Sequence, residues 1–456
     1  MIDTAVLLQL VKGYFFDVDI VWRKTREEIK KLQNKRLRRI IRYAYSVPVY
    51  HKKYKKAGVR PDDIKGIEDI EKLPVITKED IRENFPDGIV PKNFNISRAE
   101  KLSTSGSTGK PVVIYADYST IIRNIIAYVR ILKAYDAKWN KTRITVIGDM
   151  AYGTAGYASF VSPLPSFIMK ALSIKNLQII DIGEEPRIMA EKINEFKPDF
   201  LNGYPGILRI LATLKMEEGI GKDISPQYIS SSGAVLDPYT RKYIEEAFNA
   251  RVFDVYESTE GGPIAFECKK GNYHLHSDMV YLEVLDENMQ PVAEGEVGKA
   301  VITRLYGKGT PIIRYAGMDD FIRKGDSKCS CGMNTECIGS IEGRRADAII
   351  TPDGKLVPPL SFTYIPSEVM NEENFYGIKQ FQIVQEDERR IVILVVPKGG
   401  EEKDKLERIY EKIKAKYEEK FGKDILIEIK EVDKIPTHGN LMPPVVISKV
   451  KKNEIT

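Results

Sequence analysis

A dense run of small polar residues constrains the fold of this 456-residue chain more than any other feature. Residues 103–111 are Ser-Thr-Ser-Gly-Ser-Thr-Gly-Lys-Pro. Glycines let the backbone approach an anion closely, and the neighbouring hydroxyl and amide groups can donate hydrogen bonds to phosphate oxygens. The run is not a Walker A loop, because Pro111 stands where that pattern needs Ser or Thr. An ordinary flexible turn is the alternative, but the density of hydroxyls and glycines favours a phosphate-binding loop.

Short apolar runs alternate with helical stretches after this loop. We expect strands at 143–148, 250–256, 281–285 and 299–303, and helices at 190–196, 206–216 and 239–248. This alternation is typical of an α/β architecture with covered sheets. Near the C-terminus, a small α+β domain is indicated by a helix at 406–421 and by strands at 381–384, 391–396 and 425–432.

The N-terminal part is expected to be helical and irregular. Thr25 and Glu28 have capping-box spacing at the start of an amphipathic helix over 25–46, which Pro48 ends. The apolar run 5–16 is too short to span a membrane and is interrupted by Lys12, so we expect a docked helix there. Residues 61–85 suggest loops and short helices, and 306–353 show little periodicity.

Composition excludes several classes of protein. The 70 basic and 65 acidic side chains give a net charge of +5 and are interspersed, so a dedicated nucleic-acid binder is not indicated. A hydrophobic fraction of 43% fits a globular chain, and four cysteines cannot form a disulfide-stapled scaffold. We expect a cytoplasmic protein with neither a nucleic-acid nor a membrane partner.

Three of the four cysteines join a histidine in two close pairs. Cys268 precedes His274 by six residues, and Cys329 and Cys331 follow later in the chain. Cys₃His is a common set of ligands for structural Zn²⁺, so these four residues are a candidate zinc site. Buried free thiols are the alternative, and His276 and Cys337 compete as ligands.

Several ordered motifs carry a resemblance to a known family. Besides the glycine-rich loop, they are segments 42–54 and 73–78, the Tyr204-Pro205 turn, Ser232-Gly233-Ala234, and Tyr-Glu-Ser-Thr-Glu at 256–260. Together they resemble the adenylate-forming superfamily of acyl-CoA synthetases, and most of all its phenylacetate-CoA ligase and coenzyme F-390 synthetase branch. The resemblance implies a large multi-layer α/β N-terminal domain, 1–343, and a small mobile α+β C-terminal lid domain, 344–456. The hinge residue would be Ala346 or Asp347.

The resemblance also implies roles for individual residues. Thr259 would donate to the α-phosphate and Glu260 would hold Mg²⁺, and with Lys110 they form the expected catalytic group. Asp319 would accept hydrogen bonds from both ribose hydroxyls, as a carboxylate can. The remaining residues expected to bind the nucleotide are Ser105, Gly106, Ser107, Thr108, Gly109, Gly233, Ala234, Tyr256 and Arg344.

The chain departs from the family pattern in two places. Met318 stands where the family usually has glycine, and Asp320 places a second acid beside Asp319. The family carries a lysine after a glycine near the C-terminus, but Asn440 stands there in this chain. Lys434, Lys449 and His438 are the nearest candidates to replace it.

The resemblance therefore implies an ATP-dependent, AMP-forming ligase that adenylates an acid, aryl or related, and passes the acyl group to coenzyme A. The alternatives are adenylyl transfer to a deazaflavin hydroxyl, and a nucleotide-binding protein with weakened catalysis. Residues 151–166 and Tyr204 are expected near the acid. The oligomeric state is left open, a homodimer being one option.

Overall fold

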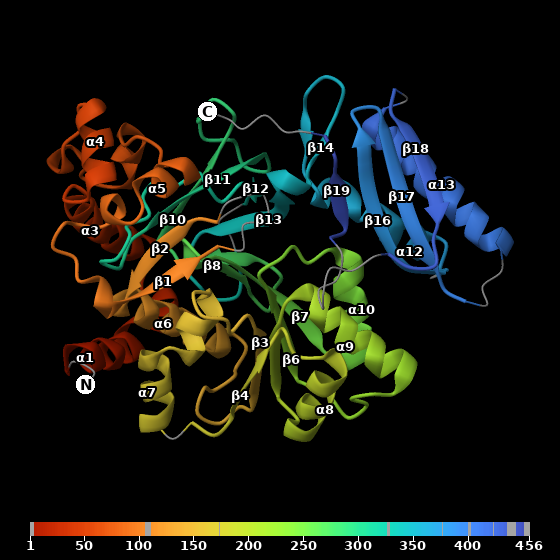
Figure 1. Ribbon diagram of the computed structural model, residues 1–456, viewed down its shortest axis with the longest axis horizontal. Coiled ribbons are helices and arrows are strands. Elements are labelled where there is room, and N and C mark those ends of the chain that lie inside the picture. The colour runs from red at the N-terminus through yellow and green to blue at the C-terminus, as the bar shows by residue number, and fades with distance from the viewer. Residues whose placement is uncertain are drawn as a thin grey trace.

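The computed structural model describes residues 4–104, 111–172, 174–325, 329–375, 377–399, 403–422, 424–435 and 444–450. Its described strands form one large sheet, one smaller sheet and two hairpins (Figure 1). None of the described helices is both long and apolar enough to cross a membrane.

Eleven of the described strands make up the large sheet, in the order β10-β11-β12-β13-β9-β8-β7-β6-β5-β3-β4. Strands β3 to β7 are parallel, and the other neighbouring pairs are antiparallel. The strands are β3 Ile144–Gly148, β4 Leu177–Asp181, β5 Phe200–Gly203, β6 Tyr228–Ser232, β7 Arg251–Ser258, β8 Gly262–Glu267, β9 Tyr273–Leu275, β10 Val280–Leu285, β11 Val297–Arg304, β12 Asp320–Lys324 and β13 Cys337–Arg344.

Helices cover both faces of the parallel half (Figure 1). Ile147 of β3 packs with α8 (Pro186–Phe196), α9 (Pro205–Glu218) and α10 (Pro238–Phe248). Ile144 and Val146 of the same strand instead pack with Ile131 of α6 (Tyr118–Ala134). Successive side chains of a strand point to opposite faces, so an apolar strand buried on both sides follows directly from this sequence. The predicted α/β architecture is confirmed.

The N-terminal segments pack beside the sheet. Helix α3 (Arg26–Ala44) begins with the predicted capping box between Thr25 and Glu28. Helix α3 ends at Ala44, and Pro48 is the first residue of α4. Proline suits this position because the first N–H of a helix has no partner within the helix. The other elements are α1 Thr4–Lys12, the π-helical turn η1 Gly13–Asp17, α2 Ile20–Arg23, α4 Pro48–Lys56, η2 Pro61–Asp63, η3 Ile67–Lys72, α5 Lys78–Asn84, η4 Asp87–Ile89, η5 Ile96–Arg98 and the hairpin β1 Ala99–Ser103 with β2 Val113–Asp117.

The C-terminal part forms its own layer of sheet and helices. The described strands pair in the order β18-β17-β16-β19, and Ile383, Ile393 and Tyr417 lie in its core. Tyr239 of α10 joins this core and donates a hydrogen bond of 2.8 Å to the carbonyl oxygen of Ile378. The elements are β14 Ile349–Ile350, β15 Leu356–Val357, α11 Leu360–Thr363, α12 Ile365–Glu372, β16 Ile378–Asp387, β17 Arg390–Pro397, α13 Lys403–Phe421, β18 Leu426–Glu431 and β19 Val446–Ser448.

The stretch 306–353 is more regular than its sequence suggests. It contains β12, β13, the turn η7 (Arg345–Asp347) and β14. Glycines, cysteines and charges hide the period of two in these strands, and both β12 and β13 carry irregular register. Asp320 of β12 and Ser340, Ile341 and Arg344 of β13 form one wall of a pocket at the edge of the large sheet.

Candidate active site

The parallel strands β6 and β7 lie side by side and end at the same edge of the large sheet. Gly233 follows β6 with a φ of 79°, a conformation that favours glycine. A Cβ atom at Gly233 would lie only 2.3 Å from Cε1 of Tyr204. The chain therefore passes the Tyr204 ring only with glycine at this position.

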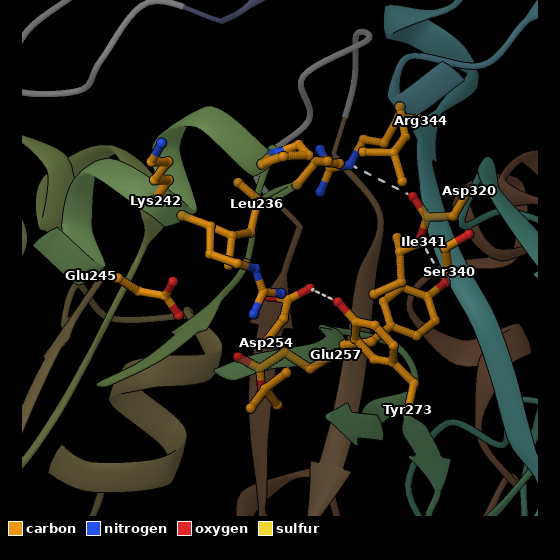
Figure 2. A pocket seen from close by; sticks show the side chains of 18 residues that line it. Leu236, Lys242, Glu245, Asp254, Glu257, Tyr273, Asp320, Ser340, Ile341 and Arg344 are labelled. Atoms are coloured by element: carbon orange, nitrogen blue, oxygen red, sulfur yellow. Dashed lines mark hydrogen bonds and ion pairs between the residues drawn. The ribbon is translucent and has the colours of Figure 1, made fainter. Parts of the chain in front are cut away.

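A pocket of about 270 Å³ opens at this edge (Figure 2). Four residues expected from the sequence to bind the nucleotide line it, namely Gly233, Ala234, Tyr256 and Arg344. The other walls include Leu236, Asp254, Tyr273, Asp320, Ser340 and Ile341. The pocket thus combines backbone at a strand end, an aromatic ring, a carboxyl group and a guanidinium.

Tyr256 and Asp320 are hydrogen-bonded to each other in this pocket. Oη of Tyr256 donates to Oδ2 of Asp320 over 2.8 Å. Nε of Arg344 lies 3.9 Å from the other oxygen, and Figure 2 shows the two side chains facing each other. Burial raises the pKa of Asp320 to about 6, although Arg344 and the Tyr256 hydrogen bond oppose this rise.

The neighbouring acid, Asp319, is placed differently. It has a φ of 57°, and its Oδ2 lies 2.5 Å from Nζ of Lys78 in an ion pair. The pocket wall is formed by Asp320 and does not include Asp319. The two acids that the sequence could not separate therefore have distinct surroundings.

Glu260 lies in the turn between β7 and β8 and is buried. Oη of Tyr315 donates a hydrogen bond of 2.8 Å to Oε1 of Glu260, and Nη1 of Arg304 donates one of 2.8 Å to its carbonyl oxygen. Burial raises the pKa of the Glu260 carboxyl, while the Tyr315 hydrogen bond lowers it. Thr259 occupies the same turn and is partly exposed.

The phosphate loop expected at Ser105, Gly106, Ser107, Thr108, Gly109 and Lys110 lies outside the described residues. The residues on either side of it are held together. Thr104 donates its N–H to the carbonyl oxygen of Val112, and Val112 donates its N–H to Oγ1 of Thr104, both over 3.0 Å. These hydrogen bonds thus extend the β1–β2 hairpin by one residue on each strand.

The C-terminal segment where the family carries its lysine, 436–443, also lies outside the described residues. Of the lysines that flank it, Lys434 is exposed. Nζ of Lys449 forms an ion pair of 2.6 Å with Glu386.

A second pocket, of about 510 Å³, adjoins the first. The two share the walls Val255 and Glu257. The second pocket is otherwise mostly apolar, and its walls include Ile126, Val146, Phe160, Ile168 and Phe200. The region expected near an acid contributes to it through Ala155, Gly156, Ser159, Phe160, Pro165 and Tyr204.

Glu257 was not singled out from the sequence, yet it stands where the two pockets meet. It is the second residue of the stretch 256–260, which carries part of the resemblance to the family. Oη of Tyr128 donates a hydrogen bond of 2.7 Å to its Oε2. Burial raises the pKa of the Glu257 carboxyl, against the hydrogen bonds from Tyr128 and Ser232. Its place between Tyr256 and Thr259 was the one signal in the sequence that could have identified it.

The four proposed zinc ligands converge on one point. One ligand atom from each of Cys268, His274, Cys329 and Cys331 lies within 4.8 Å of the others. Sγ of Cys268 and Sγ of Cys329 are 3.7 Å apart, and Sγ of Cys331 lies 3.1 Å from Nε2 of His274. Tetrahedral Zn²⁺ with Zn–S bonds of about 2.3 Å needs sulfurs about 3.8 Å apart, so the four residues fit this ion.

His276 and Cys337, the two residues that compete as zinc ligands, lie outside the group of four. His276 is buried with its Nδ1 2.9 Å from Nη1 of Arg130 and belongs to a different cluster. Sγ of Cys337 lies 3.6 Å from Nδ1 of His274, beside the four-residue group rather than within it.

Comparison with family models finds two matches. A model described as AMP-binding enzyme matches residues 102–305, which include the glycine-rich loop and strands β6 and β7 beside the first pocket. A model described as CapK C-terminal domain matches residues 349–447.

Individual relatives and solved structures are also similar to this chain. Phenylacetate-coenzyme A ligase of Thermus thermophilus is 30% identical over 71% of this chain and 72% of its own length. Protein CapK of Staphylococcus aureus is 24% identical over 94% of each chain. The structure of 2-hydroxyisobutyryl-CoA ligase in the postadenylation state is similar in fold, with a TM-score of 0.78 at 20% identity over 94% of this chain and 91% of that one. The chain therefore belongs to the adenylate-forming acid–coenzyme A ligases, in the phenylacetate-coenzyme A ligase branch.

Proposed function

We propose that this protein is an ATP-dependent, AMP-forming ligase that adenylates an apolar carboxylic acid, aryl or related, and transfers the acyl group to coenzyme A. The observation that carries the proposal is the contact between the two pockets at Val255 and Glu257. An acyl-adenylate has a nucleotide at one end and an acyl group at the other. It therefore needs a polar and an apolar pocket that meet.

The nucleotide would occupy the first pocket. The ring of Tyr256 and the backbone of Gly233 and Ala234 suit the face and edge of adenine. A carboxylate accepts two hydrogen bonds side by side, which suits the ribose hydroxyls. Asp320, as a pocket wall, is as strong a candidate for this task as Asp319, with Arg344 beside it.

The first half-reaction joins the acid to AMP. A carboxylate oxygen attacks the α-phosphorus of ATP, the new O–P bond forms as the bond to pyrophosphate breaks, and pyrophosphate leaves with the bonding electrons. In the second half-reaction the coenzyme A thiol, losing its proton, attacks the acyl carbon and AMP leaves. Thr259, Lys110 and the loop 105–109 would stabilise the negative charge that develops around the phosphorus.

Mg²⁺ suits Glu260, because hard cations prefer carboxylate oxygens. Glu260 would hold the ion, which supplies neutralising charge for the phosphates when it is bound. Tyr315 fixes one oxygen of the Glu260 carboxyl through its hydrogen bond. This contact orients the group before any ligand arrives.

We also propose that residues 344–456 act as a lid that turns between the two half-reactions against the large domain, 1–343. Gly343 has a φ of 104°, and a Cβ there would lie 2.7 Å from Cγ of Pro359. The boundary thus has backbone freedom that only glycine provides. Ala346 or Asp347 would be the hinge residue.

The Cys₃His cluster is proposed to hold a structural Zn²⁺, because four protein ligands leave no open position for chemistry. His274 lies opposite Cys337 in the β9–β13 pairing. The far end of β13 supplies Ser340, Ile341 and Arg344 to the nucleotide pocket. The metal would therefore fasten the start of a strand whose other end forms the active site.

The test is exchange of labelled pyrophosphate into ATP in the presence of Mg²⁺, with aryl acids, alkyl acids and a deazaflavin offered separately. We expect exchange with an acid, and release of AMP that saturates with coenzyme A. Exchange with the deazaflavin alone, without any effect of coenzyme A, would establish the alternative adenylyl transfer. The apolar walls of the second pocket favour the acid over that polar ring system.

The variant Glu260→Ala removes the proposed Mg²⁺ ligand. It should abolish the Mg²⁺-dependent exchange of pyrophosphate into ATP and leave the fold intact. ATP binding without exchange for any compound would support a nucleotide-binding protein without turnover. In that case Asn440→Lys, which restores the family lysine, should create activity.

A further inference from the structure

The second pocket is larger than one aromatic ring requires. Its volume is about 510 Å³. An engineered apolar cavity of about 150 Å³ is already enough to hold benzene. An acid with a single ring would therefore leave most of this pocket without contacts, and unfilled apolar volume forfeits binding energy.

The polar and apolar walls of the pocket are separated along the strands. Asp149, Asn202 and Ser232 line it at the carboxyl ends of β3, β5 and β6, beside Glu257 and the nucleotide pocket. Ile144 and Phe200 line it at the amino ends of β3 and β5. The pocket thus follows β3 over its five residues. At about 3.3 Å per residue, this path is about 13 Å long.

The pocket opens between α1–η1 and α7 (Pro163–Ala171), which lie together on one side of the molecule (Figure 1). Large apolar side chains at this mouth are both pocket walls and exposed to solvent. The exposed fractions are 65% for Phe15, 44% for Val11, 42% for Phe167 and 50% for Leu172. Apolar side chains gathered at the rim of a pocket mark a place where an apolar ligand continues outward.

We propose that the acid substrate carries a long apolar chain, which lies along β3 and leaves the pocket between α1–η1 and α7. The inference rests on the proposed ligase activity, replaces its aryl acid by a long alkyl acid, and places the carboxyl group at Glu257 beside the nucleotide. A path of about 13 Å matches about ten chain carbons in an extended zigzag of about 1.5 Å bonds. Longer chains reach the exposed rim.

The test measures kcat/KM for pyrophosphate exchange with straight-chain acids from butyric to hexadecanoic acid, and with benzoic and phenylacetic acids. Each methylene buried in the pocket should raise kcat/KM about threefold to fourfold. The rise should flatten beyond about ten carbons, where the chain meets solvent. The long acids should exceed both aryl acids.

Two neighbouring phenylalanines give a matched pair of variants. Phe15 lines the mouth, whereas Phe16 is 63% exposed and is not a pocket wall. Phe15→Ser and Phe167→Ser should lower kcat/KM for dodecanoic acid at least threefold and leave butyric acid unchanged. Phe16→Ser should change neither.

The outcomes separate this inference from the proposed function. Best activity with an aryl or short acid, or equal effects of Phe15→Ser on short and long acids, would overturn the long-chain substrate and leave the ligase activity standing. Absence of exchange with every acid would overturn both. A second measurement needs no turnover: in calorimetry, dodecanoic acid should bind wild-type protein more tightly than it binds Phe15→Ser protein, and equal affinities would count against the chain's path.

Discussion

The phenol of Tyr128 donates a hydrogen bond of 2.7 Å to the carboxyl group of Glu257, at the boundary between the two pockets. An acid at this position would face both the carboxylate of the substrate and the phosphate of the nucleotide. Ionised, it would repel both of these anions. Burial raises the pKa of Glu257, which keeps it neutral to a higher pH than an exposed glutamate.

The charge state of Glu257 should therefore shape the pH dependence of adenylation. As the pH rises above 4.5 and through the raised pKa of Glu257, the carboxyl ionises, and we expect kcat/KM for the acid to fall. Glu257→Gln keeps an acceptor for Tyr128 but removes the titration, so this fall should disappear. Pyrophosphate exchange measured from pH 5 to 9 decides the point. Identical pH profiles for the two proteins would contradict the assignment.

Asp254 should make the protein less stable as the pH rises, whereas an acid in a salt bridge makes a protein more stable as the pH rises. It is fully buried, and Tyr273 donates a hydrogen bond of 2.7 Å to its Oδ2. Burial raises its pKa from 3.8 to about 7. Its contribution to the free energy of unfolding is therefore complete below about pH 4 and is lost as the pH rises to about 7.

The comparison that isolates this effect is wild type against Asp254→Asn. The difference in free energy of unfolding between the two proteins should shift by roughly 2–4 kcal/mol against wild type between pH 4 and 7. Urea denaturation at several pH values measures it. A difference that stays constant over this range would show that Asp254 is ionised throughout.

The variant Tyr256→Phe should distinguish the contribution of the Tyr256 ring to ATP binding from the contribution of its hydroxyl group to stability. The variant keeps the aromatic face but leaves the partly buried Asp320 carboxyl without this donor, which costs about 1 kcal/mol of stability. ATP should still bind, because the ring remains, whereas Tyr256→Ala should weaken ATP binding at least tenfold. Thermal unfolding and calorimetric titration with ATP check the two effects. Equal ATP affinity in all three proteins would remove Tyr256 from the nucleotide site.

The Cys₃His cluster should bind one zinc ion per chain. Cys331→Ser removes a ligand, so its zinc content should fall and its melting temperature should drop. Cys337→Ser changes a neighbouring thiol that lies beside the four ligands, and it should keep the metal. Elemental analysis of the wild type and the two variants measures the number of zinc ions per chain. Wild-type protein that is folded and free of zinc would end the proposal.

Much of the fold could be predicted because its signals are local. The capping box at Thr25 and Glu28 and the doubly buried strand at Ile144–Gly148 each depend on a few adjacent residues. Strands β12 and β13 were missed because irregular register and interspersed glycines disturb the alternation of apolar side chains. Their pairing depends on partners far away in the chain.

The candidate site was predictable only as far as its motifs reach. Gly233, Ala234, Tyr256 and Arg344 stand in recognisable stretches and meet in one pocket. The sequence could not distinguish Asp319 from Asp320, because only the ion pair with Lys78 and the hydrogen bond from Tyr256 separate them. The walls of the apolar pocket come from residues far apart in the chain, from Leu10 to Glu257, so no local sequence pattern predicts its size.

The most direct test of the central claim is to look for the acyl-adenylate itself. Wild-type protein is mixed with ATP, Mg²⁺ and an acid active in exchange, without coenzyme A, and the protein-bound nucleotides are analysed by mass spectrometry. The account predicts a stoichiometric acyl-AMP that converts to acyl-CoA and AMP when coenzyme A is added. Acyl-CoA formed together with ADP and phosphate, with no adenylate at any time, would contradict it.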